Sequence, residues 1–101
     1  MAIVIEGHQD LRSAAALRFA LLGAIAEGGE LVVDVAAVET ADLAFLQLIE
    51  ASRREAARGG GRLTLAAPAQ GMLRDVLDFA GFLAADDCAG VSFWLHGETA
   101  Q

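Results

Sequence analysis

The chain has 101 residues, of which 55% are hydrophobic, and its 14 acidic and 7 basic side chains give a net charge of −7. This length suits one domain with its own core, and the composition excludes an intrinsically disordered chain. The acidic balance also disfavours nucleic acid as a partner, because binding to a phosphate backbone needs a positive surface.

The first predicted elements are a strand and a helix. The β-branched run at residues 2–6 predicts a strand, which Gly7 ends. Asp10 is a candidate N-cap of a helix over residues 11–26, which a Gly-Gly pair stops. The apolar positions recur at helical spacing and predict the buried stripe of this helix: Leu11, Ala14, Leu17, Leu21 and Ala24, widened by Ala15, Leu22 and Ile25.

A second strand and helix form the centre of the chain. Residues 31–35 are apolar except at Asp34, which is typical of a strand covered on both faces. A loop at residues 36–40 leads to a helix that begins near Asp42 and runs to residue 58. Thr40 is a plausible N-cap of this helix, and the charge of Asp42 suits its positive end. The three glycines at 59–61 follow a helix and precede a strand, which predicts a turn and not a phosphate-binding loop.

The last third of the chain continues the alternation. Residues 62–67 predict a third strand, bounded by Pro68, and residues 69–80 predict a third helix. The apolar stripe of this helix is Met72, Leu73, Val76, Leu77 and Ala80. A loop is expected at residues 84–90, a last strand at 91–95 (VSFWL), and a polar tail at 96–101. Strands that alternate with helices predict an α/β domain, in which helical crossovers join neighbouring parallel strands.

Three features bear on the compartment. No apolar run approaches the ~20 residues that span a bilayer, and the start MAIVIEGHQD lacks the basic and apolar regions of a signal peptide. The single cysteine, Cys88, cannot form a disulfide within the chain, which favours a reducing compartment. The sequence therefore predicts a cytoplasmic protein without direct membrane insertion.

Candidates for chemistry are few. His8 and His96 lack the paired spacing of metal ligands, and no serine lies at a strand-to-helix elbow where a nucleophile would be expected. Asp34 and Asp42 flank one junction, where two carboxylates could hold Mg²⁺ or act as an acid–base pair. Stabilisation of a helix end explains Asp42 better, and hydrogen bonds to loop amides explain Asp34 better. We therefore expect no enzyme activity, no metal site and no cofactor.

The order of elements around residues 31–58 resembles the STAS domains, the anti-sigma factor antagonist family. In that family an Asp-Ser-Ser-Gly-Leu-type motif opens the helix after the central strand. The matching run here is Asp42-Leu43-Ala44-Phe45-Leu46. The Asp and the final Leu match, two hydroxyl residues are replaced by leucine and alanine, and glycine is replaced by phenylalanine. The similarity extends over residues 6–85.

The resemblance implies one STAS-like α/β domain over residues 1–101, with a mixed sheet of four or five strands packed against helices. The first strand of the family is absent or merged. The resemblance also implies a non-enzymatic bacterial regulatory module that binds a protein partner such as an anti-sigma factor kinase. In the family the kinase phosphorylates a Ser or Thr at the positions of Leu43 and Ala44, which have no hydroxyl, so this control cannot operate in its usual form.

Other roles remain open on sequence alone. STAS domains also act as small subunits of phospholipid-transport ABC complexes and among chemotaxis components, and some relatives bind nucleotides. A nucleotide-binding domain is therefore a further alternative, and a homodimer is an open possibility.

The expected partner surface is the junction between the central strand and its helix: Thr40, Asp42, Leu43, Ala44 and Phe45. α/β folds build binding sites at such junctions, and residues 43–45 are more apolar than a helix start requires. Phe45 has two interpretations, because a large aromatic at this position either fills the core or forms a binding anchor. The pattern alone favours core or half-buried packing.

Overall fold

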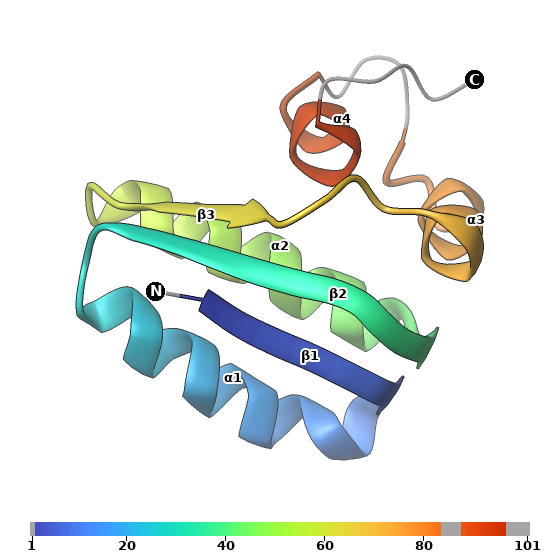
Figure 1. Ribbon diagram of the computed structural model, residues 1–101, viewed down its shortest axis with the longest axis horizontal. Coiled ribbons are helices and arrows are strands. Elements are labelled where there is room, and N and C mark those ends of the chain that lie inside the picture. The colour runs from blue at the N-terminus through green and yellow to red at the C-terminus, as the bar shows by residue number, and fades with distance from the viewer. Residues whose placement is uncertain (1, 84–87, 97–101) are drawn as a thin grey trace.

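In the described part of the chain, three parallel strands form one sheet, in the order β1-β2-β3 (Figure 1). The computed structural model describes residues 2–83 and 88–96. The elements, in chain order, are β1 (Ala2–Gln9), α1 (Leu11–Ala26), β2 (Glu30–Ala41), α2 (Leu43–Arg58), β3 (Arg62–Leu65), α3 (Gly71–Phe79) and α4 (Cys88–Leu95). Helices α1 and α2 are thus the crossovers between neighbouring parallel strands, as the alternation in the sequence predicts.

The core lies between the sheet and the two crossover helices. Leu31, Val33 and Val35 of β2 are buried, and the residues between them are half-buried, so one face of the strand is covered more fully than the other. Helices α1 and α2 pack against each other, α1 along β1 and α2 along β3. Their buried side chains complete one continuous apolar cluster: Leu21 and Ala24 from α1, and Phe45, Leu46, Ile49 and Ala56 from α2.

Helices α1 and α2 have the predicted bounds to within a residue or two. Helix α3 lies within the predicted range 69–80 but is shorter at both ends. The prediction of a loop at residues 36–40 is wrong, because β2 continues to Ala41 and pairs there with β1. Strand β1 likewise continues past Gly7, where its predicted end lay. The pairing shifts register between Gly7 and His8, and Gly7 has a φ of +78°. A glycine in this left-handed conformation permits a β-bulge, which bends the strand without ending it.

The predicted last strand at residues 91–95 is also wrong, because these residues belong to α4. Phe93, Trp94 and Leu95 are three successive buried side chains. Alternate side chains of a strand point to opposite faces, so a strand on this exposed edge would leave at least one of the three in water. A short helix buries all three, and the Trp94 carbonyl accepts a hydrogen bond from the Ala69 backbone N–H at 2.8 Å.

The expectation of a mixed sheet of four or five strands is therefore wrong for the described residues, which form three strands, all parallel. Of the loop expected at residues 84–90, residues 84–87 lie outside the described part and residues 88–90 belong to α4. Residues 97–101 of the expected tail also lie outside it. Among the helices at residues 2–83 and 88–96, none has both the length and the apolarity needed to cross a bilayer.

Candidate functional site

The starts of α1 and α2 lie next to each other at the carboxyl ends of β1 and β2 (Figure 1). The Asp42 backbone N–H donates to the Gln9 carbonyl at 3.2 Å. One step earlier in the two strands, His8 Nδ1 and Thr40 Oγ1 are hydrogen-bonded at 2.8 Å. These contacts join two strand-to-helix junctions into one surface, which we call the junction edge. Binding sites of parallel α/β sheets form at such edges.

An aspartate caps each of the two helices. Asp10 Oδ1 accepts from the backbone N–H groups of Arg12 and Ser13 at 2.9 and 3.3 Å, and the Ser13 side chain completes a capping box. Asp42 Oδ1 accepts from the Phe45 N–H at 3.1 Å. The prediction of Asp10 as an N-cap is confirmed. The prediction of Thr40 as an N-cap is wrong, because Thr40 still lies within β2.

The carboxyl group of Asp10, at the start of α1, has a lowered pKa. Desolvation acts to raise the pKa of this carboxyl, but backbone hydrogen bonds from Arg12 and Ser13 and the charge of Arg12 outweigh it, so its pKa lies below the ordinary value. Asp10 is therefore ionised at neutral pH and stabilises the positive end of α1. Because folding lowers its pKa, this stabilisation is present above the ordinary Asp pKa and is lost as the pH falls through the lowered value.

The structure divides the five predicted surface residues into three groups. Thr40 and Leu43 are exposed, Leu43 by 50%, while Asp42 and Ala44 are half-buried. Phe45 is only 1% exposed and belongs to the core. The favoured interpretation of Phe45 as a core residue is therefore confirmed, and its inclusion in the predicted partner surface is wrong. The accessible apolar part of the motif is thus Leu43.

Two residues of the junction edge are absent from the predicted surface. Leu11 was expected on the buried stripe of α1, but it is 75% exposed. It is the first residue of α1, as Leu43 is of α2, and each leucine directly follows its capping aspartate. The second residue is His8, which lies at the junction edge because its ring is hydrogen-bonded to Thr40. The repeat of Asp-Leu after two strands is the sequence signal that could have identified Leu11.

Asp34 and the glycine run have structural roles. Asp34 Oδ1 accepts from the Ala36 backbone N–H at 2.9 Å, so this carboxylate, like Asp42, has a local backbone partner. Within residues 2–83 and 88–96, no three His, Cys, Asp or Glu side chains gather in a way that could hold a metal ion. Gly60 has a φ of +83°, and a Cβ on Gly61 would lie 2.7 Å from the Gly29 carbonyl oxygen. The predicted turn is therefore confirmed, and both glycines are needed for it.

The different positions of Thr40 and Asp42 give a stability test. We expect Asp42→Ala to lower the free energy of unfolding by about 1 kcal/mol, because it leaves a first-turn N–H of α2 without its acceptor. Thr40→Ala should cost less than about 0.5 kcal/mol, because Thr40 is exposed and does not cap the helix. Urea unfolding followed by circular dichroism measures both. A larger loss for Thr40→Ala than for Asp42→Ala would contradict the assigned cap.

The chain matches a known protein family. The family model described as "Mlab, STAS domain" matches residues 1–85 of the chain. That range contains all three described strands and helices α1 to α3, including the whole junction edge. No curated protein sequence matches the chain significantly.

Proposed function

Since the chain belongs to the STAS domain family, we propose that it is a non-enzymatic regulatory module that binds a protein partner through the junction edge. The observation that carries this proposal is the exposure of Leu43 in the segment through which, by the family resemblance, STAS domains contact their partners. Exposed apolar side chains that gather at one edge are typical of interfaces. Leu11 adds a second such side chain at the same edge.

The chemistry of the junction edge indicates what the partner must offer. Leu11 and Leu43 require an apolar surface against them, because their transfer out of water supplies the favourable free energy. The two capping carboxylates already accept backbone hydrogen bonds, so their negative charge is partly balanced by the helix ends. The His8–Thr40 pair adds exposed polar groups at the same edge, which a partner could meet with polar groups of its own.

We further propose that binding is constitutive and is not switched by phosphorylation in the usual way. Leu43 and Ala44 hold the two family phosphoacceptor positions and have no hydroxyl. A phosphate would bring about −1.5 to −2 charges to the surface and disrupt an apolar contact. Thr40 is the nearest hydroxyl, and its oxygen is hydrogen-bonded to His8.

Affinity capture with mass spectrometry tests the function. The chain, immobilised by a terminal tag, is expected to retain a protein partner from cytoplasmic extract of its source. Incubation of the bound complex with ATP should leave residues 40–46 without phosphate. A phosphate on Thr40 that releases the partner would restore the switch and contradict constitutive binding.

The second candidate is the small subunit of a phospholipid-transport ABC complex. The absence of hydroxyls at Leu43 and Ala44 favours it, because a permanent subunit needs no phosphorylation switch. The same capture experiment separates the two: a kinase-like partner supports the signalling role, and a transport ATPase supports the second candidate.

A further inference from the structure

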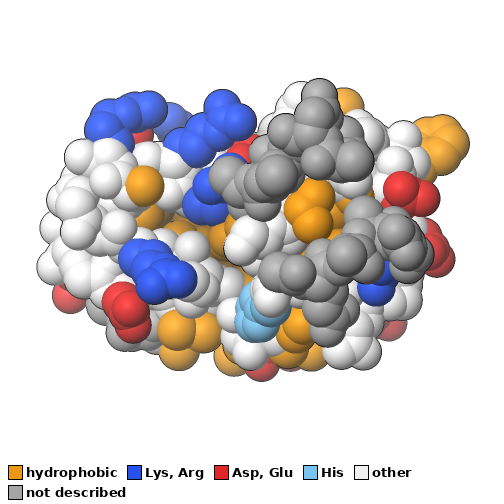
Figure 2. Space-filling view, turned by 90° about the horizontal axis from the view of Figure 1, so that it is seen from above, with side chains coloured by type: hydrophobic (Ala, Val, Ile, Leu, Met, Phe, Trp, Pro, Cys, Tyr) orange, Lys and Arg blue, Asp and Glu red, His pale blue; other side chains and the backbone are white. Residues whose placement is uncertain are grey.

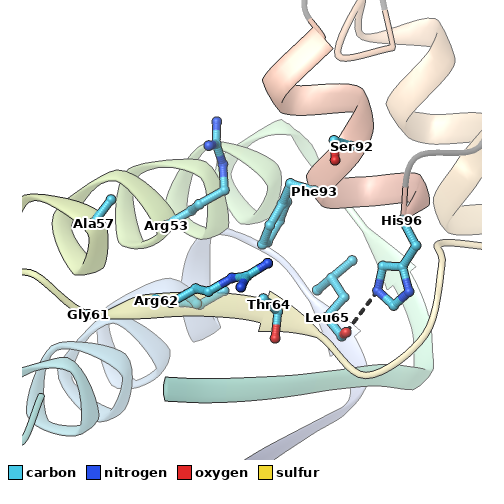
Figure 3. A pocket seen from close by; sticks show the side chains of 10 residues that line it. Arg53, Ala57, Gly61, Arg62, Thr64, Leu65, Ser92, Phe93 and His96 are labelled. Atoms are coloured by element: carbon cyan, nitrogen blue, oxygen red, sulfur yellow. Dashed lines mark hydrogen bonds between the residues drawn. The ribbon is translucent and has the colours of Figure 1, made fainter. Parts of the chain in front are cut away.

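An open groove of about 650 Å³ follows the outer edge of β3, between α2 and α4 (Figure 3). Its floor is the strand itself, from Gly61 to Leu65. One wall is formed by Arg53 and Ala57 of α2, and the other by Phe93 of α4 and by His96. None of these residues belongs to the junction edge.

The hydrogen bonds at the two ends of β3 show which of its backbone groups face β2. The Arg62 N–H donates to the Gly29 carbonyl at 3.0 Å, and the Ala66 N–H donates to the Val33 carbonyl at 2.9 Å. Backbone groups of successive strand residues point alternately to the two sides, so the N–H and C=O groups of Leu63 and Leu65 point away from β2. The His96 ring agrees with this, because its Nε2 lies 2.8 Å from the Leu65 carbonyl oxygen.

His96 therefore occupies one of four outward backbone groups. Within the part of the chain that the structure describes, the N–H and C=O of Leu63 and the N–H of Leu65 have no protein hydrogen-bond partner. An edge strand with free backbone groups is a template for one more strand. Extended peptides bind to many domains by this type of strand addition.

The positive charge at the groove comes from Arg62. The exposed Arg62 side chain extends along β3 toward Phe93 (Figure 3) and makes no ion pair with any described residue. The Arg53 guanidinium carbon lies 5.4 Å from the Phe93 ring centroid, but this guanidinium forms an ion pair with Glu50, so the charge of Arg53 is largely balanced. The described lining contains no carboxylate. Figure 2 shows arginine side chains gathered at one end of the face that carries α4.

This local charge is opposite to that of the whole chain, whose net charge is −7. A second copy of an acidic chain would therefore be repelled as a whole, whereas an acidic segment of another protein would be attracted to the groove. The length of β3, four residues, allows pairing over a short segment only. The side chain at the centre of such a segment would lie within reach of Arg62.

We propose that this groove binds an extended acidic segment of a partner protein, which adds as a parallel or antiparallel strand to the β3 edge and places a carboxylate against Arg62. The backbone groups of Leu63 and Leu65 supply the strand hydrogen bonds, and Arg62 supplies the preference for acidic sequences. This surface is separate from the junction edge and goes beyond the function proposed above.

Synthetic peptides test the proposal directly. The probe is acetyl-TVEVEVT-amide, titrated into ¹⁵N-labelled protein and followed by NMR. We expect saturable binding with the largest shifts at the Leu63 and Leu65 amides. A lysine twin, acetyl-TVKVKVT-amide, should bind at least tenfold more weakly because of its charge. An acidic twin with an N-methyl group on every residue should lose at least tenfold as well, because it has no backbone N–H left to donate to β3.

Variants of the protein separate the groove from the rest of the surface. Arg62→Glu should weaken binding of the acidic peptide at least tenfold, while Arg18→Glu, the same change at an exposed position on α1, should leave it within twofold. Ala57→Trp should block the groove sterically, and Ala51→Trp, also exposed on α2 but outside the groove, should not. Thermal melting by circular dichroism verifies that each variant is folded.

Three outcomes would overturn the proposal. Equal binding of the acidic, lysine and N-methylated peptides would show that neither charge nor strand pairing matters. Inorganic phosphate that binds at the same amides as tightly as the acidic peptide would reveal a small-anion pocket. Self-association in analytical ultracentrifugation that Arg62→Glu abolishes would assign the edge to a second copy of the chain.

Discussion

Replacing Phe45 by alanine is expected to lower the free energy of unfolding by about 3–5 kcal/mol. Phe45 is one of the largest fully buried side chains and lies in the first turn of α2, within the core cluster. The change removes apolar surface from the core and leaves a cavity that its neighbours fill only in part. A domain of this size is stable by about 5–15 kcal/mol, so the loss is a large fraction of the total. Equilibrium unfolding in urea measures it.

Leu43→Ala is the matched control, because it truncates a large apolar residue two positions earlier in the same helix. Leu43 is 50% exposed, so its truncation should cost less than about 1 kcal/mol. If Phe45→Ala were as stable as Leu43→Ala and yet lost its partner, Phe45 would be an interface residue and its core assignment would be wrong.

The helices of this fold are predictable from sequence because their signals are local. The spacing of apolar residues and the aspartates at 10 and 42 predict where α1 and α2 run. A capping aspartate and the backbone N–H that donates to it lie within three residues of each other, so the signal is local. The sequence assigns the cap of α2 to Thr40 instead of Asp42 because the pairing of β2 with β1, which extends to Ala41, is not local. The family resemblance also rests on this stretch, and the match to residues 1–85 confirms it.

The strand ends and the last helix depend on contacts that a linear pattern does not contain. Strand β2 continues to Ala41 only because β1 continues past Gly7 by means of a bulge. The run VSFWL is apolar at nearly every position, so its periodicity cannot distinguish a strand from a helix. Its structure depends on Trp94, whose burial and hydrogen bond to Ala69 join segments 25 residues apart in the chain.

The sequence predicts only part of the candidate site, because the rest also depends on contacts between distant segments. Thr40 and Leu43 are exposed at the expected junction, while Phe45 turns into the core. The spacing of apolar residues assigned Leu11 to the buried stripe of α1. The apolar stripe of a helix indicates which of its sides faces the sheet. It does not indicate that the first residue of α1, Leu11, lies beyond the end of the sheet. Only the pairing of Asp42 with Gln9 brings this leucine to the same edge as Leu43.

Replacing Leu43 by aspartate is expected to weaken binding of the captured partner by about 2–4 kcal/mol, the size of a hot-spot loss. This corresponds to a roughly 30- to 700-fold rise in Kd. The half-exposed leucine would contact the apolar part of the partner, and a carboxylate there would be desolvated without a cation. Isothermal titration calorimetry against the purified partner measures the change.

The Leu43→Asp variant should remain folded, because a carboxylate in the first turn of α2 interacts favourably with the helix dipole. Its neighbour Asp42 brings a like charge, which solvent screens at this exposed position. Phe79→Asp is the matched control: Phe79 is 95% exposed and lies on α3, away from the junction edge. It introduces the same charge in place of a larger exposed apolar side chain and should leave Kd within twofold.

Leu11→Asp extends the test to the second leucine of the junction edge. If Leu11 and Leu43 contact one continuous partner surface, each single change should weaken binding, and the double variant should lose less than the sum of the two losses. This is because the first charge already disrupts the apolar contact that the second would break. Unchanged binding by folded Leu43→Asp would place the interface elsewhere, and strict additivity would assign the two leucines to separate contacts.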